Sequence, residues 1–103
     1  MIRYMLCFLL SINVLYAAAE DDPLVNLKKG QPNDVAALIE RRVGCNHWGG
    51  EEPYDGEREK EISSAVAHLK CGRLATDESI LIKRYAKKPK ALKALKKAKD
   101  MSY

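Results

Sequence analysis

The residue types best suited to binding or catalysis gather in one glycine-rich stretch of the chain, residues 45–58. This stretch holds the only tryptophan and one of the two histidines, together with several carboxylates. Loops that combine rigid aromatic rings and charges with conformationally permissive glycines often form binding sites. We therefore take this stretch as a candidate binding loop. Its candidate binding residues are His47, Trp48, Glu51, Glu52, Tyr54 and Arg58.

The first interpretation of this loop is a contact surface for another protein. Trp48 would serve as an anchor, because tryptophan is enriched among the residues that contribute most to protein interfaces. The acidic pair Glu51 and Glu52 would complement basic groups on the partner. The pattern favours a small binding module for an exported protein partner, of the inhibitor or immunity type.

The second interpretation of the same residues is purely structural. Trp48 could cover a disulfide bridge and fill a small core, with its indole N–H bonded to a backbone carbonyl. Glu51 and Glu52 could pair with Arg58. Tyr54 could pack against the stem of Arg58 at the start of a helix. On this interpretation the loop closes the core of the domain and has no specific ligand.

A zinc site is a third interpretation. The spacings Cys45-x-His47 and His68-x-x-Cys71 supply two thiols and two imidazoles, a set that tetrahedral zinc accepts. A disulfide between the two cysteines would use the same sulfur atoms and so exclude the metal. We therefore expect no bound metal and no cofactor.

Catalysis is the least favoured use of these residues. His47 together with Glu51 or Glu52 could move protons. A disulfide would consume both cysteine nucleophiles, however, and the serines have no histidine motif beside them. The 84 residues that follow the predicted signal peptide also leave little room for a pocket that excludes water. We expect that the protein is not an enzyme.

The start of the chain has the features of a secretory signal peptide, over residues 1–19. Arg3 provides a positive charge, an apolar run follows over residues 5–15, and residues 17–19 are alanines. The rest of the chain keeps two cysteines, Cys45 and Cys71. An even number of cysteines in a short exported chain predicts a disulfide. We expect a periplasmic or secreted protein with a Cys45–Cys71 bridge.

The periodicity of apolar residues predicts several helices between residues 34 and 99. No segment alternates apolar and polar residues for long enough to predict a sheet. The predicted fold class is all-α, a compact bundle of about four short helices with one disulfide. The predicted helices run over residues 34–43, 57–70, 76–85 and 90–99, with a loop over residues 44–56. The predicted divisions are a signal peptide at 1–19, an irregular leader at 20–33, a helical domain at 34–99 and a tail at 100–103.

Charge is divided unevenly along the chain. Residues 20–82 carry 8 basic and 13 acidic groups, whereas residues 83–103 carry 9 basic groups and 1 acidic group. The basic end is typical either of a solvated helix face or of a weak electrostatic contact with an anionic envelope surface. Nucleic acid is not an expected partner, because the chain is exported and its lysines are not interleaved with aromatic rings.

Three stretches of the chain form a recognisable pattern: C-N-H-W-x-G-E-E-P-Y-D at 45–55, E-R-x-x-E-I at 57–62, and D-E-x-x-L-x-x-x-Y at 77–85. In these stretches and in Cys71 the chain resembles a group of small uncharacterised exported proteins of Gram-negative bacteria. The resemblance covers residues 34–98. It implies a periplasmic helical domain with one disulfide and assigns no activity.

Overall fold

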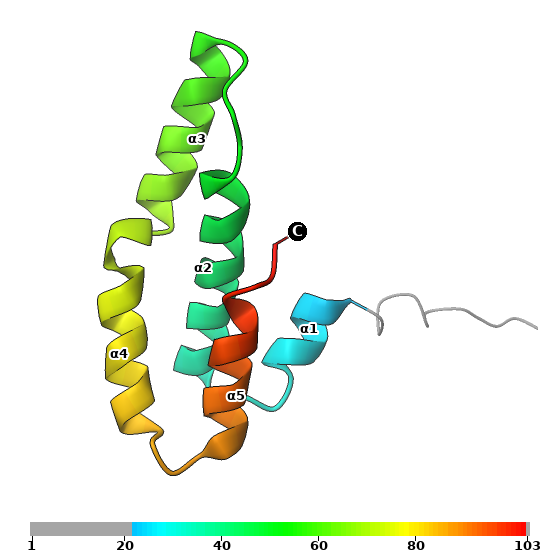
Figure 1. The fold of residues 1–103 in the computed structure, drawn as a ribbon, viewed down its shortest axis with the longest axis vertical. Coiled ribbons are helices and arrows are strands. Elements are labelled where there is room, and N and C mark those ends of the chain that lie inside the picture. The colour runs from blue at the N-terminus through cyan, green and yellow to red at the C-terminus, as the bar shows by residue number, and fades with distance from the viewer. Residues whose placement is uncertain (1–21, 103) are drawn as a thin grey trace, which may run out of the picture.

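The computed structural model describes residues 22–102, and this part of the chain is all-helical (Figure 1). The predicted fold class is confirmed, with five α-helices and one 3-10 helix in this range. Residues 1–19, where we predict a signal peptide, lie outside the described residues. No helix within residues 22–102 has the length and apolar character needed to span a membrane. The helices are α1 (Pro23–Lys28), α2 (Asn33–Gly49), α3 (Gly56–His68), η2 (Cys71–Arg73), α4 (Leu74–Arg84) and α5 (Pro89–Ala98).

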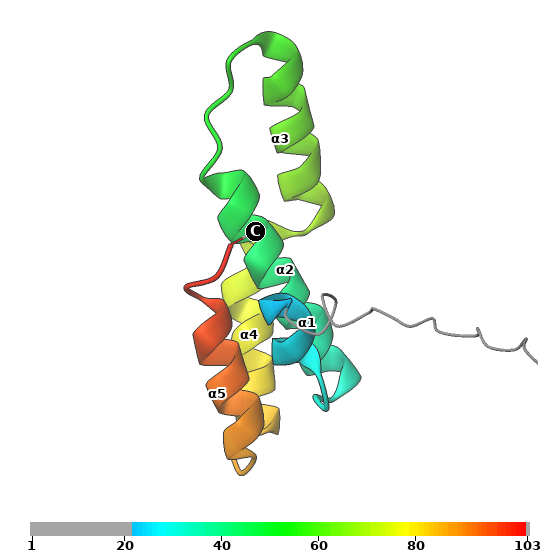
Figure 2. The same cartoon turned by 90° about the vertical axis from the view of Figure 1, so that its right-hand side faces the viewer.

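Helix α2 is the central element, and α1, α3, α4 and α5 all contact it (Figure 2). Its apolar residues recur every three or four positions, so they form one stripe that faces the core. The small alanines of α5 allow that helix to approach α2 closely. The buried core consists of Val35, Leu38, Ile39, Val43, Leu74, Leu81, Ala91, Ala94, Leu95 and Ala98.

The leader at 20–33 is not wholly irregular, because residues 23–28 form helix α1. Asp22 caps the helix by accepting a hydrogen bond from the backbone N–H of Leu24 at 2.9 Å. Pro23 occupies the first helical position, where its missing N–H costs nothing. Leu24 and Leu27, three residues apart, pack against the core. Tertiary contact therefore stabilises a segment too short to be helical on its own.

Helix α2 runs past the point where we expected the loop to begin. The predicted helix ends at residue 43, yet Gly44 is a buried residue inside α2, which continues to Gly49. Packing against neighbouring elements outweighs the low helix propensity of this glycine. His47 and Trp48 consequently lie on the last turn of α2, and the prediction that they belong to a loop is wrong.

A disulfide joins Cys45 to Cys71 with an S–S distance of 2.07 Å, as predicted. The residues between them form a projection, here called the arm (residues 45–71), which extends beyond the helices of the core (Figures 1 and 2). It comprises the last turn of α2, a connecting loop and helix α3. No residue of α3 is buried. The disulfide thus closes the base of an arm that lies outside the hydrophobic core.

Arg41 on α2 holds the base of the arm from the other side. Its Nε donates to the carbonyl oxygen of Leu69 at 2.9 Å, and its Nη2 donates to that of Lys70 at 3.0 Å. Its Nη1 lies 3.0 Å from a carboxylate oxygen of Asp77 on α4. One guanidinium therefore binds the carbonyls of the two residues that follow α3 and links them to α4.

Candidate functional site

Arg58, near the start of α3, is the centre of a side-chain cluster in the arm. Its Nη2 donates to Oε1 of Glu51 at 2.7 Å, and its Nη1 donates to Oε1 of Glu61 at 3.1 Å. Its guanidinium carbon lies 5.0 Å from the centre of the Trp48 ring and 6.0 Å from that of Tyr54. A cation over an aromatic face is attracted by the ring's quadrupole. Arg58 therefore connects the end of α2, the loop and α3.

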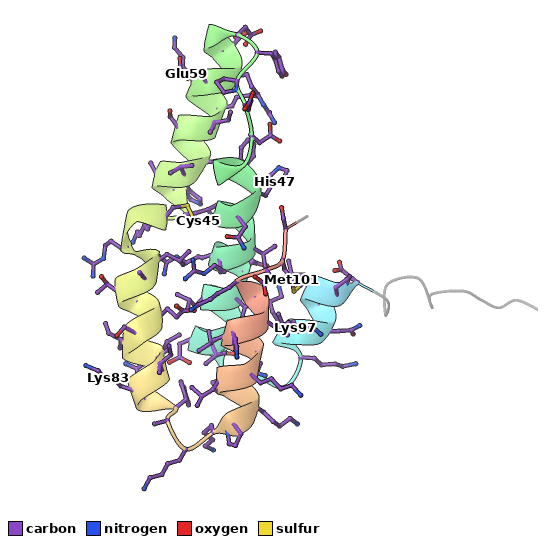
Figure 3. All side chains as sticks on the ribbon, viewed as in Figure 1. Cys45, His47, Glu59, Lys83, Lys97 and Met101 are labelled. Carbon is purple, nitrogen blue, oxygen red and sulfur yellow. A yellow bond between two sulfur atoms is a disulfide. The ribbon has the colours of Figure 1, made fainter. Side chains whose placement is uncertain are left out.

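His47 extends this cluster along the last turn of α2. Its Nε2 lies 3.5 Å from a carboxylate oxygen of Glu51, four residues further along the chain. Its ring meets that of Trp48 edge to face, with centroids 5.2 Å apart. The helical conformation of residues 47 and 48 produces this arrangement, which a flexible loop would not fix. Figure 3 shows His47 at the end of α2, next to the loop.

The local electrostatics favour a permanent ion pair between Glu51 and Arg58. The hydrogen bond from Arg58 is the largest influence on Glu51 and lowers its pKa. Burial raises this pKa by a smaller amount than the hydrogen bond lowers it, and the electrostatic effects of Arg58 and His47 lower it further. In return, the hydrogen bonds to Glu51 and Glu61 raise the pKa of Arg58. The pair is therefore charged throughout the neutral range.

Helix α3 begins at a defined position in this cluster. The side chain of Asp55 caps it by accepting a hydrogen bond from the backbone N–H of Arg58 at 2.8 Å. The acidic residues Glu57 and Glu59 in its first turn lie near the positive end of the helix dipole. The cap thus sets the position from which the Arg58 side chain reaches back to α2.

The structure brings together five of the six candidate binding residues and leaves Glu52 apart. The expected pair between Glu51 and Arg58 is present. Tyr54 lies beside Arg58, whose guanidinium carbon is 6.0 Å from its ring centre, but the Tyr54 side chain remains 79% exposed. Trp48 is half-buried and does not belong to the core, so the expectation that it fills the core is wrong.

Two residues of this region have roles that the sequence analysis did not assign. Glu61 shares Arg58 with Glu51, and the three-residue spacing between Arg58 and Glu61 on a helix could have indicated it. Asn46 donates from its amide nitrogen to the carbonyl oxygens of Ala98, Lys99 and Met101 at 2.7–3.2 Å. Asn46 therefore holds the end of α5 against α2 and does not face the arm's cluster.

A broad hollow of about 860 Å³ lies along one face of α3, next to the preceding loop. Tyr54, Arg58, Glu61, Ser64 and His68 are among its lining residues. Most of these residues are exposed, so the hollow is open to solvent and does not exclude water. Such a surface can contact a partner along its length, whereas a small substrate would remain hydrated in it.

The cysteines of the Cys2His2 set are bonded to each other. Neither sulfur is therefore a thiolate ligand in this form of the protein. Within residues 22–102, moreover, no group of three or more His, Cys, Asp or Glu side chains has an arrangement that could hold a metal ion.

No protein-family model matches the sequence, and comparisons with curated proteins and with solved structures gave no significant match. The geometry of the arm is therefore the basis for assigning a function.

Proposed function

We propose that the protein is a small exported helical binding module of the bacterial cell envelope. It binds a protein partner through the arm, as inhibitor-type and immunity-type proteins bind their targets. The observation that carries this proposal is the position of α3, a helix of 13 residues without a buried residue. A helix that adds so little to the core, yet is closed by a disulfide and capped by Arg41, is suited to presenting a surface in a fixed shape. Such preorganisation lowers the entropic cost of binding.

The far end of the arm, here called the tip (residues 51–61), indicates the kind of partner. Tyr54 is an exposed aromatic residue there, at 79%, and tyrosine is frequent at the energetic centres of interfaces. The surrounding residues 51–61 carry six carboxylates and two cations. A partner with a cleft that accepts an aromatic ring and has basic groups at its rim would complement this tip. The carboxylates are Glu51, Glu52, Asp55, Glu57, Glu59 and Glu61.

His47, Trp48, Glu51 and Arg58 have a supporting role in this proposal. They are half-buried and contact one another, so they fix the loop from below. Tyr54 and Glu52 project from the loop and would contact the partner directly. The Cys45–Cys71 disulfide supports an oxidising location, in agreement with a periplasmic or secreted protein.

Site-specific photo-crosslinking tests the proposal. A photoreactive residue replaces Tyr54 at the tip in one variant and Ile82 on α4 in the other, both exposed positions. In the exported fraction of the native host, we expect one discrete adduct from position 54 and none from position 82. Reversing two unpaired charges of the tip with Glu52→Lys and Glu59→Lys should reduce that adduct by about tenfold or more.

Circular dichroism of the charge-reversal variant provides the folding control. Equal adducts from both positions, no adduct from position 54, or an adduct that the two lysines leave unchanged would contradict the proposal. Any of these results would favour the structural alternative, in which the arm has no specific ligand.

A further inference from the structure

We propose a second interaction surface, separate from the arm: a lysine-lined groove between α1 and α5 that docks the protein on an anionic lipid membrane. The groove has a volume of about 310 Å³. Its floor includes the apolar residues Leu27 and Ala94. Its polar rim is formed by Lys29, Gln31, Lys90, Lys93 and Lys97.

Two segments far apart in the sequence build this groove. On α5, residues 90, 93 and 97 follow the three- and four-residue spacing that places side chains on one helix face. After α1, Gly30 adopts a left-handed conformation (φ +76°), which turns the chain back toward α5. The side-chain amide of Gln31 then donates to the carbonyl oxygen of Lys90 at 3.4 Å. The turn brings Lys29 next to the lysines of α5.

The positive charge of the groove is not neutralised within the described chain. Among residues 22–102, no carboxylate lines the groove or forms an ion pair with Lys29, Lys90, Lys93 or Lys97. The neighbouring lysines differ in this respect. Lys28 pairs with Glu40 at 2.7 Å, and Lys99 lies 3.6 Å from Glu78. Four unpaired ammonium groups around one groove are a surface suited to phosphate-bearing head groups.

The membrane contact must be electrostatic, because α5 has no free apolar face. A basic amphipathic helix can bind membranes by inserting its apolar side among the lipids. In α5 that side is formed by Ala91, Ala94, Leu95 and Ala98, which are buried in the core, and is flanked by the half-buried Leu92. Insertion would require α5 to leave α2. We therefore expect binding that depends on head-group charge and weakens as salt screens it.

The charge distribution would also orient the protein on the membrane. The carboxylates of the tip lie on the arm, at the opposite end of the molecule from the turn that joins α4 to α5. Figure 3 shows Glu59 on the arm, Lys83 near that turn and Lys97 on α5. An anionic surface would attract the groove and repel the tip. The membrane contact would then be made by the α1–α5 side of the molecule and not by the tip of the arm, and the groove's binding does not depend on the arm's proposed function.

A second copy of the chain is the competing occupant, with its acidic tip in the lysine groove. The contacts that the tip makes within its own chain favour the membrane over a second copy as the occupant of the groove. Glu51 and Glu61 are already paired with Arg58, and Asp55 accepts the hydrogen bond that caps α3. Part of the tip's negative charge is thus used within the arm. Sedimentation velocity without lipid tests this alternative directly.

Vesicle flotation of the full chain, in the form that cells export, tests the proposal. We expect binding to vesicles of about 30% phosphatidylglycerol in phosphatidylcholine at low salt, and loss of binding at several-fold higher salt. Pure phosphatidylcholine vesicles should bind nothing. The variant Lys90→Gln/Lys93→Gln/Lys97→Gln should bind on the order of 100-fold more weakly, because each lysine at an anionic surface contributes roughly fivefold.

The matched control is Lys83→Gln/Lys87→Gln/Lys96→Gln, which removes the same charge outside the groove. It should weaken binding by less than about tenfold. An equal loss in both triple variants would overturn the groove as the docking site, because net charge alone would then explain binding. Binding to uncharged vesicles, no binding at all, or salt-dependent self-association that the groove variant abolishes would overturn the proposal as well. The tip variant Glu52→Lys/Glu59→Lys should still float, so failure of the arm's proposed function would be distinguishable.

Discussion

The guanidinium carbon of Arg58 lies 5.0 Å from the centre of the Trp48 ring, across the gap between the end of α2 and the start of α3. This contact and the Glu51 ion pair join the two sides of the arm above its disulfide. The chain contains a single tryptophan, so tryptophan emission reports on the surroundings of Trp48, which include this contact and the edge-to-face contact with His47.

Arg58→Ala should therefore open the arm near its tip without unfolding the core. The variant removes the cation over the Trp48 ring and the hydrogen bonds to Glu51 and Glu61. We expect a red-shifted Trp48 emission and stronger quenching by iodide, with unchanged core stability in urea. Lys60→Ala, which removes an exposed cation from the same helix, is the control. Identical spectra for the two variants would contradict this role of Arg58.

The Glu51 ion pair should give the arm an acid-sensitive transition. The pKa of Glu51 is lower in the folded protein than the ordinary value of 4.5, chiefly because of the hydrogen bond from Arg58. The stabilisation is therefore complete above the pKa of the unfolded chain and is lost as the pH falls through the lower, folded pKa. We expect the Trp48 emission to be constant at neutral pH and to change only below about pH 4.5.

Glu51→Gln should remove this transition, because its side chain does not titrate. Its emission should already resemble that of the acidified wild type at neutral pH. A transition of the same size in this variant would assign the acid sensitivity to another group.

Asp34 and Tyr85 should make global stability depend on pH at both extremes. The Tyr85 hydroxyl donates to Asp34 at 2.8 Å, and Nη1 of Arg84 donates to the other carboxylate oxygen at 2.6 Å. The hydrogen bond from Tyr85, followed by those from Arg84 and the backbone, lowers the pKa of Asp34 against the effect of burial. The bond to Asp34, together with burial, raises the pKa of Tyr85 above 10.0.

The pKa of Asp34 is lowered and that of Tyr85 is raised, so the two groups lose their stabilising effect at opposite ends of the pH range. The stabilisation from Asp34 is lost as the pH falls below its ordinary value of 3.8, whereas that from Tyr85 is lost as the pH rises above 10.0. Tyr85→Phe should lower the melting temperature at neutral pH and remove the alkaline loss. Tyr54→Phe changes an exposed tyrosine and should leave both the melting temperature and the loss of stability at alkaline pH unchanged. Equal melting curves for the two variants would argue against the Asp34 contact.

Reduction of the disulfide should release the arm before the core. In the chain-entropy model, closing a loop of this length stabilises by about 3.5 kcal/mol. Because α3 has no buried residue, it has few other contacts to replace that contribution. Hydrogen exchange after reduction should show loss of protection over residues 56–68, while residues 35–43 of α2 retain theirs. Uniform loss of protection in both helices would mean that arm and core unfold together.

Truncation of an apolar side chain should reduce the free energy of unfolding more in the core than in the arm. Leu95 is 2% exposed within the core, so Leu95→Ala should reduce the free energy of unfolding by roughly 3 kcal/mol. Ile62 on α3 is only half-buried, and Ile62→Ala should cost less than about 1.5 kcal/mol. Urea denaturation of both variants provides the comparison. Equal losses would place α3 in the cooperative core.

The sequence predicts the class of fold and much of its detail. The helix predicted at 90–99 is present as α5, which begins one residue earlier at Pro89, and the two cysteines predict the bridge that the structure contains. Gly44 misleads because glycine usually ends helices, whereas here it is buried within α2. The helical state of residues 23–28 depends on packing against the core, which local periodicity does not reveal.

The candidate site could be predicted only where its contacts join residues that are close in the sequence. The Glu51–Arg58 pair follows from two opposite charges that are close in sequence. The roles of Arg41 and Asn46 cannot be predicted in this way, because their hydrogen-bond partners are backbone carbonyls 28 to 55 residues away in the sequence. A sequence identifies a side chain that can cap a helix end, but only the folded chain brings that end within reach.

The placement of α3 outside the hydrophobic core has an evolutionary consequence. Substitutions on its surface would meet little opposition from packing, since no side chain of α3 is buried among the helices that stabilise the molecule. Selection can therefore remodel what the arm recognises while the remaining helices stay nearly constant. A lineage of such proteins would diversify most easily on the part of α3 that follows the shared 45–62 pattern.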